Sequence, residues 1–376
     1  MKIVLTGGGS GGHFNPLIAV AEEINLLVQE RKLVPPQLYY FADKPYDEQA
    51  LFENQIKFIK ISAGKWRRYF SLQNFFDLWR TARGMWTALW KLYTLYPDVI
   101  FSKGGYVSFP VLWAARILRI PVAIHESDSH PGRVALWSGK FAARVALSFP
   151  EATPHFSVEK TAVTGNPIRA SLKKPITTGA REYLQIDPEA PIIFITGGSQ
   201  GAVTLNEAVL KILPDLVSRY AIIHQAGAEN LAEVKSRSGL ILENNPQAGR
   251  YQAYDYLNEV ALKMVAGAAT LAVSRAGAGM IFELANWQLP AILIPIPEAI
   301  SHDQRSNAFT YARSGGAVVI EQENLTPSVL LAEIDRLVGD AHLREEMKRG
   351  AKSFARPEAG RLIAEALIGL ALEHEE

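Results

Sequence analysis

Short apolar runs alternate with longer amphipathic segments along the whole chain. A short apolar run between polar turns is typical of a buried strand. Such runs occupy residues 3–5, 37–42, 58–61, 97–101 and 121–124 in the first half, and 191–196, 221–225, 270–273 and 290–295 in the second. The segments between them carry apolar residues at helical spacing. This alternation predicts an α/β fold with parallel sheets and helices on both faces.

Two glycine-rich turns divide this pattern into halves. Residues 6–16 read Thr-Gly-Gly-Gly-Ser-Gly-Gly-His-Phe-Asn-Pro, and residues 196–201 read Thr-Gly-Gly-Ser-Gln-Gly. Glycine lets backbone N–H groups approach a ligand, and the N-terminus of the following helix favours negative charge. One such turn could be a plain connection that binds nothing. Two of them indicate two Rossmann-like domains that face each other across a cleft.

We place these domains at residues 1–166 and 167–356, with a polar linker at 173–181. Arg356-Pro357 interrupts the helices that close the second domain. The last helix, predicted at about 357–376, is long enough to return and pack on the first domain.

Composition and charge narrow the possible functions. The chain has 376 residues, no cysteine and a net charge of +1. The lack of cysteine excludes disulfides and thiolate metal sites. The near-neutral charge argues against a nucleic-acid partner, and no apolar run approaches the roughly 18–20 residues of a membrane span.

Polar clusters follow three predicted strands of the first half, at residues 10–13, 103–106 and 125–128. Ligands of such sheets bind beyond the carboxyl ends of the strands, so we expect these clusters to line one site. His13 could serve as a titratable group there or could simply hydrogen-bond the glycine loop. His125 has no second histidine at ligand spacing, so a polar substrate wall is the better interpretation of the third cluster than a metal site.

The region 64–93 mixes aromatic residues with cations. Six cations stand against the single anion Asp77: Lys65, Arg67, Arg68, Arg80, Arg83 and Lys91. A helical pattern in this region places large apolar residues on one side: Leu72, Phe75, Phe76, Trp79, Ala82, Trp86, Leu89, Trp90 and Tyr93. These residues could form an ordinary core face. The preceding loop Trp66–Phe70 fits that interpretation poorly, and we expect it to bind an anionic membrane surface together with the adjacent helix.

In the second half, small residues open a helix after the strand at 270–273. Residues 274–283 read Ser-Arg-Ala-Gly-Ala-Gly-Met-Ile-Phe-Glu. Bare amides at a helix N-terminus predict a diphosphate site. Glu283 could accept hydrogen bonds from a ribose or be a plain surface glutamate. Residues 302–307 place further polar groups after the next strand.

Seven motifs in this order resemble those of the UDP-N-acetylglucosamine–N-acetylmuramyl-(pentapeptide) pyrophosphoryl-undecaprenol N-acetylglucosamine transferases, the MurG family. They are Gly-Gly-x-Gly-Gly-His at 8–13, Gly-Gly-Tyr-Val-Ser at 104–108, His-Glu at 125–126, Gly-Asn-Pro-Ile-Arg at 165–169, Gly-Gly-Ser-Gln-Gly-Ala at 197–202, Arg-x-Gly-Ala at 275–278 with Glu283, and Gln304-x-x-Asn-Ala. Each motif is weak alone, but the ordered set covers nearly the whole chain and is specific.

The resemblance implies a GT-B glycosyltransferase fold and transfer of GlcNAc from UDP-GlcNAc to the C4 hydroxyl of MurNAc in lipid I, with inversion, giving lipid II for peptidoglycan. It also implies a peripheral enzyme on the cytoplasmic face of the plasma membrane, acting with other proteins of cell-wall synthesis in cell shape and division.

The resemblance further assigns residues to the two substrates. In the second domain, the backbone of Leu257 would meet uracil, the segment 278–280 the diphosphate and Glu283 the ribose. Polar and neighbouring positions would complete the donor site: Arg169, Ser199, Gln200, Arg275, Ala278, Gly279, Met280, Ile281, Phe282 and Gln304. In the first domain, the acceptor or the donor sugar would meet Ser10, Gly11, Gly12, Tyr106 and Asp128. Many members of the family read His-Glu-Gln-Asn where this chain has Ser127 and Asp128.

Inverting transfer needs a base for the acceptor hydroxyl. His13 is the first candidate, because an unperturbed imidazole titrates near pH 6.5, and Glu126 is the second. Neither a metal nor another cofactor is required, since helix N-termini and cations can stabilise the departing UDP. Three alternatives share features with this interpretation: a UDP-GlcNAc 2-epimerase, another lipid-acceptor glycosyltransferase, and a non-catalytic membrane scaffold.

Overall fold

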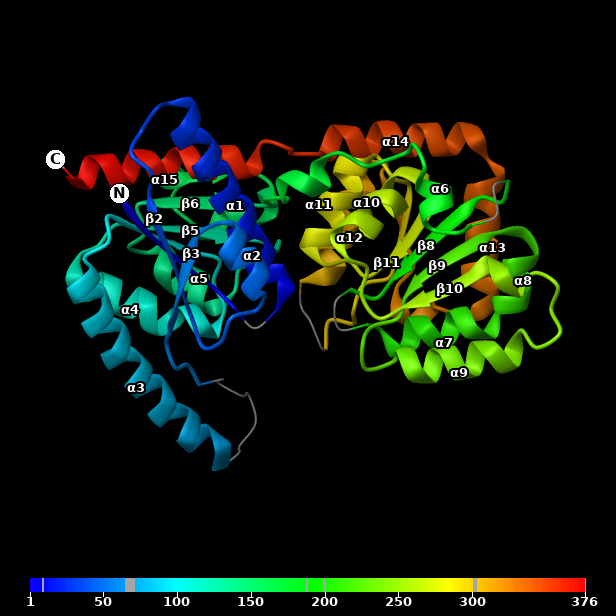
Figure 1. Cartoon of the computed structure of the whole chain (residues 1–376), viewed down its shortest axis with the longest axis horizontal. Coiled ribbons are helices and arrows are strands. Elements are labelled where there is room, and N and C mark those ends of the chain that lie inside the picture. Colours follow the sequence, from blue (N-terminus) through cyan, green and yellow to red (C-terminus); the bar gives the residue numbers. More distant parts are fainter. Residues whose placement is uncertain (9, 65–71, 187–188, 199–200, 300–302, 376) are drawn as a thin grey trace. The chain divides into compact units, whose positions relative to one another are not determined.

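The computed structural model describes residues 1–8, 10–64, 72–186, 189–198, 201–299 and 303–375 (Figure 1). The chain divides into two compact units. The first comprises Met1–Ala170 and Arg356–Glu376, and the second comprises Ser171–Ala355. Each unit contains its own parallel sheet, which confirms the α/β fold class predicted from the sequence.

Within the described residues, seven parallel strands form the first sheet in the order β3-β2-β1-β4-β5-β6-β7. Their bounds are β1 Lys2–Thr6, β2 Gln37–Ala42, β3 Ile56–Lys60, β4 Val99–Ser102, β5 Val122–Glu126, β6 Arg144–Leu147 and β7 Thr161–Val163. The strand order reverses between β1 and β4. The loops after these two strands therefore diverge and leave room for a ligand.

Helices cover both faces of this sheet, because successive side chains of each buried strand point to opposite sides. The helices are α1 Gly11–Glu30, α2 Glu48–Glu53, α3 Leu72–Leu95, α4 Phe109–Leu118, α5 Arg133–Gly139 and α15 Ala359–Glu375, with 3₁₀ turns Tyr106–Ser108, Pro150–His155 and Val158–Lys160. A further 3₁₀ turn, Ala170–Lys173, leads into the second unit. Ile3 and Leu5 pack in the cluster that includes α1 and α15, whereas Val4 packs in the cluster that includes α3 and α4. One strand thus serves two core layers.

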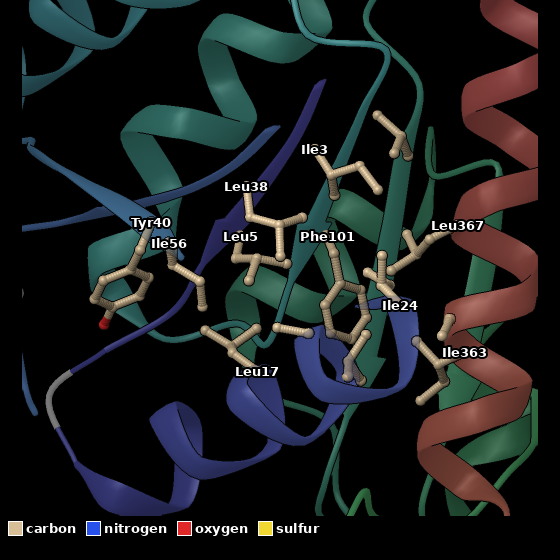
Figure 2. Packing of buried hydrophobic residues seen from close by; sticks show 14 of the residues in the cluster. Ile3, Leu5, Leu17, Ile24, Leu38, Tyr40, Ile56, Phe101, Ile363 and Leu367 are labelled. Atoms are coloured by element: carbon tan, nitrogen blue, oxygen red, sulfur yellow. The ribbon is translucent and has the colours of Figure 1, made fainter. Parts of the chain in front are cut away.

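The C-terminal helix α15 completes the core of the first unit. Figure 2 shows Ile363 and Leu367 of α15 facing Ile24 of α1 and Phe101 of β4. The side chains of Leu367 and Phe101 are fully buried. The last helix thus belongs to the first unit, although it follows the second unit in sequence.

The second sheet has six described parallel strands in the order β10-β9-β8-β11-β12-β13. They are β8 Ile192–Thr196, β9 Ala221–Gln225, β10 Tyr251–Tyr254, β11 Leu271–Ser274, β12 Ala291–Leu293 and β13 Ala317–Val319. Its helices are α6 Ala180–Tyr183, α7 Val203–Lys211, α8 Leu213–Arg219, α9 Leu231–Ile241, α10 Glu259–Ala268, α11 Ala278–Trp287, α12 Gln304–Arg313, α13 Pro327–Gly339 and α14 Ala341–Phe354, with 3₁₀ turns Ala248–Arg250 and Gln322–Asn324. Here the order reverses between β8 and β11, so the loops after these strands diverge.

Helix α3 does not bury its aromatic residues as an ordinary core face would. Ala88 and Leu92 are fully buried, whereas four large aromatic side chains of the helix are exposed: Trp79 66%, Trp86 74%, Trp90 66% and Tyr93 64%. Small and aliphatic residues allow the close contact with α4, so the aromatics lie on the other side. Among the described residues, no helix has the length and apolar character needed to cross a bilayer.

Candidate active site

The glycine loop after β1 presents His13 at the start of α1. Ser10 is the N-cap of α1, yet its hydroxyl does not cap the helix. The Ser10 Oγ instead lies 3.0 Å from His13 Nδ1. This contact fixes the imidazole ring and leaves Nε2 to face the loop after β4. Gly11 and Gly12 form the first turn of α1, so their amides lie at the positive end of the helix.

Gly105 allows the loop after β4 to approach His13. Its φ is +80°, and a Cβ built there would lie 3.4 Å from Gly8 O and 3.6 Å from His13 Nε2. A side chain at this position would be strained and would crowd the imidazole. Tyr106 follows directly and is half-buried. The reversal of strand order therefore brings the clusters after β1 and β4 together.

Glu126 ends β5 with its carboxylate turned into the protein, at 8% exposure. Oε1 accepts the backbone N–H of Asp128 at 3.1 Å, and Oε2 accepts that of Gly132 at 2.9 Å. These bonds hold the loop after β5 in a tight turn. Asp128 is half-buried on this loop.

The two candidate bases have pKa values displaced in opposite directions. Burial, with a smaller contribution from the Lys103 cation, lowers the pKa of His13 to about 4. Burial and the neighbouring Asp128 raise the pKa of Glu126 to about 7, against the opposing effect of its hydrogen bonds and Lys103. The unperturbed value near pH 6.5 therefore does not describe His13 in the folded chain, first because of burial and second because of the Lys103 cation.

His125 is buried in the first unit, and Arg169 is half-buried. His125 is 1% exposed, and its Nε2 lies 3.0 Å from Gly165 O and 3.3 Å from Ser148 Oγ. Burial and Lys103 hold its pKa well below the usual value, so His125 is a neutral, buried ring on β5. Arg169 is half-buried on the segment after β7.

In the second unit, the N-terminus of α11 has the geometry of an anion site. The amides of Ala278, Gly279 and Met280 precede the first intrahelical bond, which Ile281 N donates to Gly277 O at 3.1 Å. A Cβ at Gly277 or Gly279 would meet only open space. A bound anion would gain about 0.3–1 kcal/mol per charge from the helix dipole, and up to about 2 when partly buried.

Two predicted site residues of α11 point away from that end. Ile281 is fully buried and Phe282 is 1% exposed. The Phe282 ring packs against Phe354 with centroids 5.2 Å apart. Their side chains belong to the core, so only their backbone could serve a ligand. Glu283 is half-buried one residue further along.

Arg275 and Gln304 tie the loops at the carboxyl end of the second sheet. Arg275 Nη1 donates to Ile294 O at 3.1 Å, and Nη2 donates to Gln322 Oε1 at 2.7 Å. Gln304 Oε1 accepts from Ile296 N at 3.2 Å. Burial lowers the pKa of Arg275. In this structure both side chains support loops.

Gln225, which the sequence reasoning missed, holds two loops at the carboxyl end of the second sheet. It ends β9, and its Oε1 accepts the backbone N–H of Leu257 at 3.1 Å. Its Nε2 reaches Thr196 Oγ1 at 3.3 Å and Gly198 O at 3.4 Å. The signal was a polar residue at the end of an apolar strand. Because the Leu257 amide is engaged, a contact with a base would have to use the Leu257 carbonyl.

The second glycine loop is described only in part. Ser199 and Gln200 lie outside the described residues. A Cβ at Gly201 would fall 2.2 Å from Ala226 O, so this position requires glycine for close packing. Among the described residues, no group of three or more His, Cys, Asp or Glu side chains is arranged to hold a metal ion.

Family models match both units. The glycosyltransferase family 28 N-terminal domain matches residues 3–147, and the glycosyltransferase family 28 C-terminal domain matches residues 192–362.

Whole-chain comparisons point the same way. A UDP-N-acetylglucosamine–N-acetylmuramyl-(pentapeptide) pyrophosphoryl-undecaprenol N-acetylglucosamine transferase of Clostridium kluyveri is 35% identical over 91% of this chain and 92% of the relative. The crystal structure of MurG from Acinetobacter baumannii superposes with a TM-score of 0.71 at 25% identity, covering 98% of this chain and 99% of that one. UDP-GlcNAc 2-epimerase from Neisseria meningitidis, bound to UDP-GlcNAc, superposes with a TM-score of 0.69 at 15% identity, over 98% of this chain and 100% of that one, which shows a shared fold.

Proposed function

Because the chain belongs to the UDP-N-acetylglucosamine–N-acetylmuramyl-(pentapeptide) pyrophosphoryl-undecaprenol N-acetylglucosamine transferases, the MurG family with the GT-B fold, we propose that it converts lipid I to lipid II. It transfers GlcNAc from UDP-GlcNAc to the C4 hydroxyl of MurNAc in undecaprenyl-pyrophosphoryl-MurNAc-pentapeptide, with inversion at the anomeric carbon. The observation that carries this proposal is the identity to such a transferase over nearly the full length of both chains.

The donor is assigned to the second unit. The amides of Ala278, Gly279 and Met280 would bind the diphosphate of UDP, because the N-terminus of α11 is bare and unobstructed. Glu283 would accept the ribose hydroxyls, and the Leu257 carbonyl would meet uracil. Arg275 and Gln304 hold the loops that frame this site.

The acceptor is assigned to the first unit, with His13 as the base. His13 is half-buried, whereas Glu126 is buried and its carboxylate accepts hydrogen bonds from two backbone amides. If Nδ1–H donates to Ser10 Oγ, then Nε2 carries the lone pair that takes the hydroxyl proton. A bound diphosphate would raise the low pKa of His13 and strengthen it as a base. Gly11, Gly12, Tyr106 and Asp128 would position the acceptor.

The membrane surface is assigned to α3. Trp79, Trp86, Trp90 and Tyr93 follow one face of this helix at spacings of seven, four and three residues, and Arg83 stands between the first two. Arg80 and Lys91 are also exposed. Aromatic side chains with neighbouring cations favour an anionic bilayer, where each cation contributes about 1 kcal/mol. The loop Trp66–Phe70, assigned to the same role from the sequence, lies outside the described residues. We expect α3 to bind the cytoplasmic face of the membrane that carries lipid I. Other proteins of cell-wall synthesis are expected to act beside it there.

The test is transfer of radiolabelled GlcNAc from UDP-GlcNAc to a lipid I analogue, with UDP-Glc and UDP-GalNAc as competing donors. We expect labelled lipid II and little competition. A UDP-GlcNAc 2-epimerase would instead act on UDP-GlcNAc without the lipid. A scaffold would bind UDP-GlcNAc and give no product, and a different lipid-acceptor enzyme would prefer another donor or acceptor. Each of these results would contradict the proposal.

A further inference from the structure

A buried lysine connects the loops that build the acceptor site. Lys103 follows β4 and is 3% exposed. Its Nζ donates to Ser127 Oγ at 2.5 Å and to Asn166 Oδ1 at 3.2 Å. Ser127 lies after β5 and Asn166 after β7. A Cβ at Gly7 would lie 3.0 Å from Lys103 Cβ, so the loop after β1 packs on the same side chain.

Two carboxyl groups and two neutral imidazoles surround this ammonium. The titratable groups that act on it or feel it are His13 at the start of α1, His125 and Glu126 on β5, and Asp128 on the following loop. Burial lowers the pKa of Lys103 to about 8, while Glu126 and Asp128 oppose that change. At neutral pH the lysine therefore carries its charge inside the protein. Burying a charge costs free energy unless other charges or hydrogen bonds compensate it.

We propose that Lys103 is a positioning residue for the transfer, which fixes the loops carrying Ser127 and Asn166 and keeps the base of the site unprotonated. A nearby positive charge disfavours the His13 imidazolium and favours the Glu126 carboxylate. Those unprotonated forms are the ones that can accept the hydroxyl proton. The inference rests on the proposed function, but it holds whichever of the two groups is the base.

The experiment compares Lys103→Met with Lys103→Arg in the full-length chain. Removing the charge raises the pKa of both His13 and Glu126, so the acid limb of the kcat/KM profile for GlcNAc transfer moves up by about one pH unit in Lys103→Met. Below the limb this shift is about a tenfold loss of rate. Lys103→Arg keeps the limb at the wild-type position. Ser127→Ala, which removes a hydrogen bond and leaves the charge, also keeps it there.

A second readout needs no substrate. The imidazole resonance of His13, assigned with His13→Gln, is titrated by NMR in wild type and Lys103→Met, and its midpoint moves to higher pH in the variant. An unchanged midpoint and an unchanged acid limb in a folded Lys103→Met would overturn the proposal. If Lys103→Met does not fold, Ser127→Asp places a carboxylate next to the ammonium and offsets its charge. The same two quantities, the acid limb of kcat/KM and the NMR midpoint of His13, are then measured in that variant. Failure of wild-type transfer refutes the proposed function alone, because the NMR titration still reports on Lys103.

Discussion

At the scale of single residues, the choice of base gives a prediction in pH. Because kcat/KM reports the free enzyme, a base with the lowered pKa of His13 stays unprotonated across the neutral range. We expect kcat/KM to stay constant as the pH is lowered from about 7.5 to about 5.5. We also expect His13→Ala to lower kcat by about 10²–10⁴-fold. Steady-state transfer assays measure both. An acid limb near pH 7, with Glu126→Gln inactive and His13→Ala active, would move the role to Glu126.

His224 gives a second residue-scale prediction, for stability. It is fully buried on β9, with Nδ1 2.8 Å from Tyr251 Oη and Nε2 3.0 Å from Asn206 Oδ1. Burial lowers its pKa to about 4, so between pH 6.5 and about 4 the unfolded chain binds a proton here that the folded chain does not. Stability from this group is complete above pH 6.5 and falls with pH through that window, by about 3 kcal/mol in total.

The measurement is the free energy of unfolding against pH for wild type and His224→Gln. The difference between them shrinks as pH falls, since the variant lacks the group that takes up the proton. His342→Gln, at a side chain that is 84% exposed, is the control for the loss of a histidine that is not buried. A constant difference between wild type and His224→Gln from pH 7 to 4.5 would contradict the assignment.

Residue types at strand ends could be predicted, but their protonation could not. The motif around His13 is visible because glycines and a histidine follow an apolar run. Its lowered pKa comes first from burial in the folded chain and second from Lys103, which is 90 positions away and lies near it because β1 and β4 are neighbours. In the same way, Ile281 and Phe282 belong to a site motif, yet the packing of α11 turns their side chains into the core.

At the scale of elements, the sequence predicted most strands of the two sheets, including the edge strand β3, but missed β6, β7, β10 and β13. None of the missed strands is buried along its whole length, so their apolar runs are short. Between β8 and β9 the structure has two helices, because Pro214 opens α8 and cannot continue the hydrogen bonding of α7.

Helix α3 shows why periodicity alone does not determine which face of a helix is buried. Its aromatics recur at helical spacing, a pattern typical of a core face. In the structure the close contact with α4 uses smaller residues. Gly84 is one of them, because a Cβ there would lie 3.5 Å from Pro110 Cγ of α4 and only 1.7 Å from Ser62 O. The exposed aromatic face is therefore available for another surface.

That face carries the element-scale prediction. We expect Trp79→Ala/Trp86→Ala/Trp90→Ala to weaken binding to vesicles containing anionic lipid by at least about tenfold, because three amphipathic rings leave the interface. Co-sedimentation with vesicles measures it. Phe52→Ala on α2, at a side chain of 83% exposure, is the matched control and binds like wild type. Equal binding of the triple variant, or binding of wild type that does not weaken as salt rises, would count against a membrane role for α3.

At the scale of the whole molecule, the first unit is not continuous in sequence. The chain leaves it after Ala170, builds the second unit, and returns at Arg356 to add α15. Six residues of α15 lie in the core cluster that also contains β1 and α1: Ile363, Ala364, Leu367, Ile368, Leu370 and Ala371. The ion pairs at its surface, Arg361 with Glu30 and Arg31 with Glu365, are exposed and contribute little. Apolar burial therefore attaches this helix.

Leu367→Ala tests that attachment and separates the two units. Leu367 is fully buried, so its truncation leaves a cavity and costs about 2–5 kcal/mol in the unfolding of the first unit. Tryptophan fluorescence follows that unit, because all but one of the seven tryptophans precede residue 171. Leu362→Ala, at a residue of 50% exposure on the same helix, changes the free energy of unfolding by less than about 0.5 kcal/mol.

Binding of UDP, assigned to the second unit, remains in both variants at temperatures where the first unit of Leu367→Ala has unfolded. Loss of UDP binding in step with tryptophan fluorescence would show instead that the two units unfold as one.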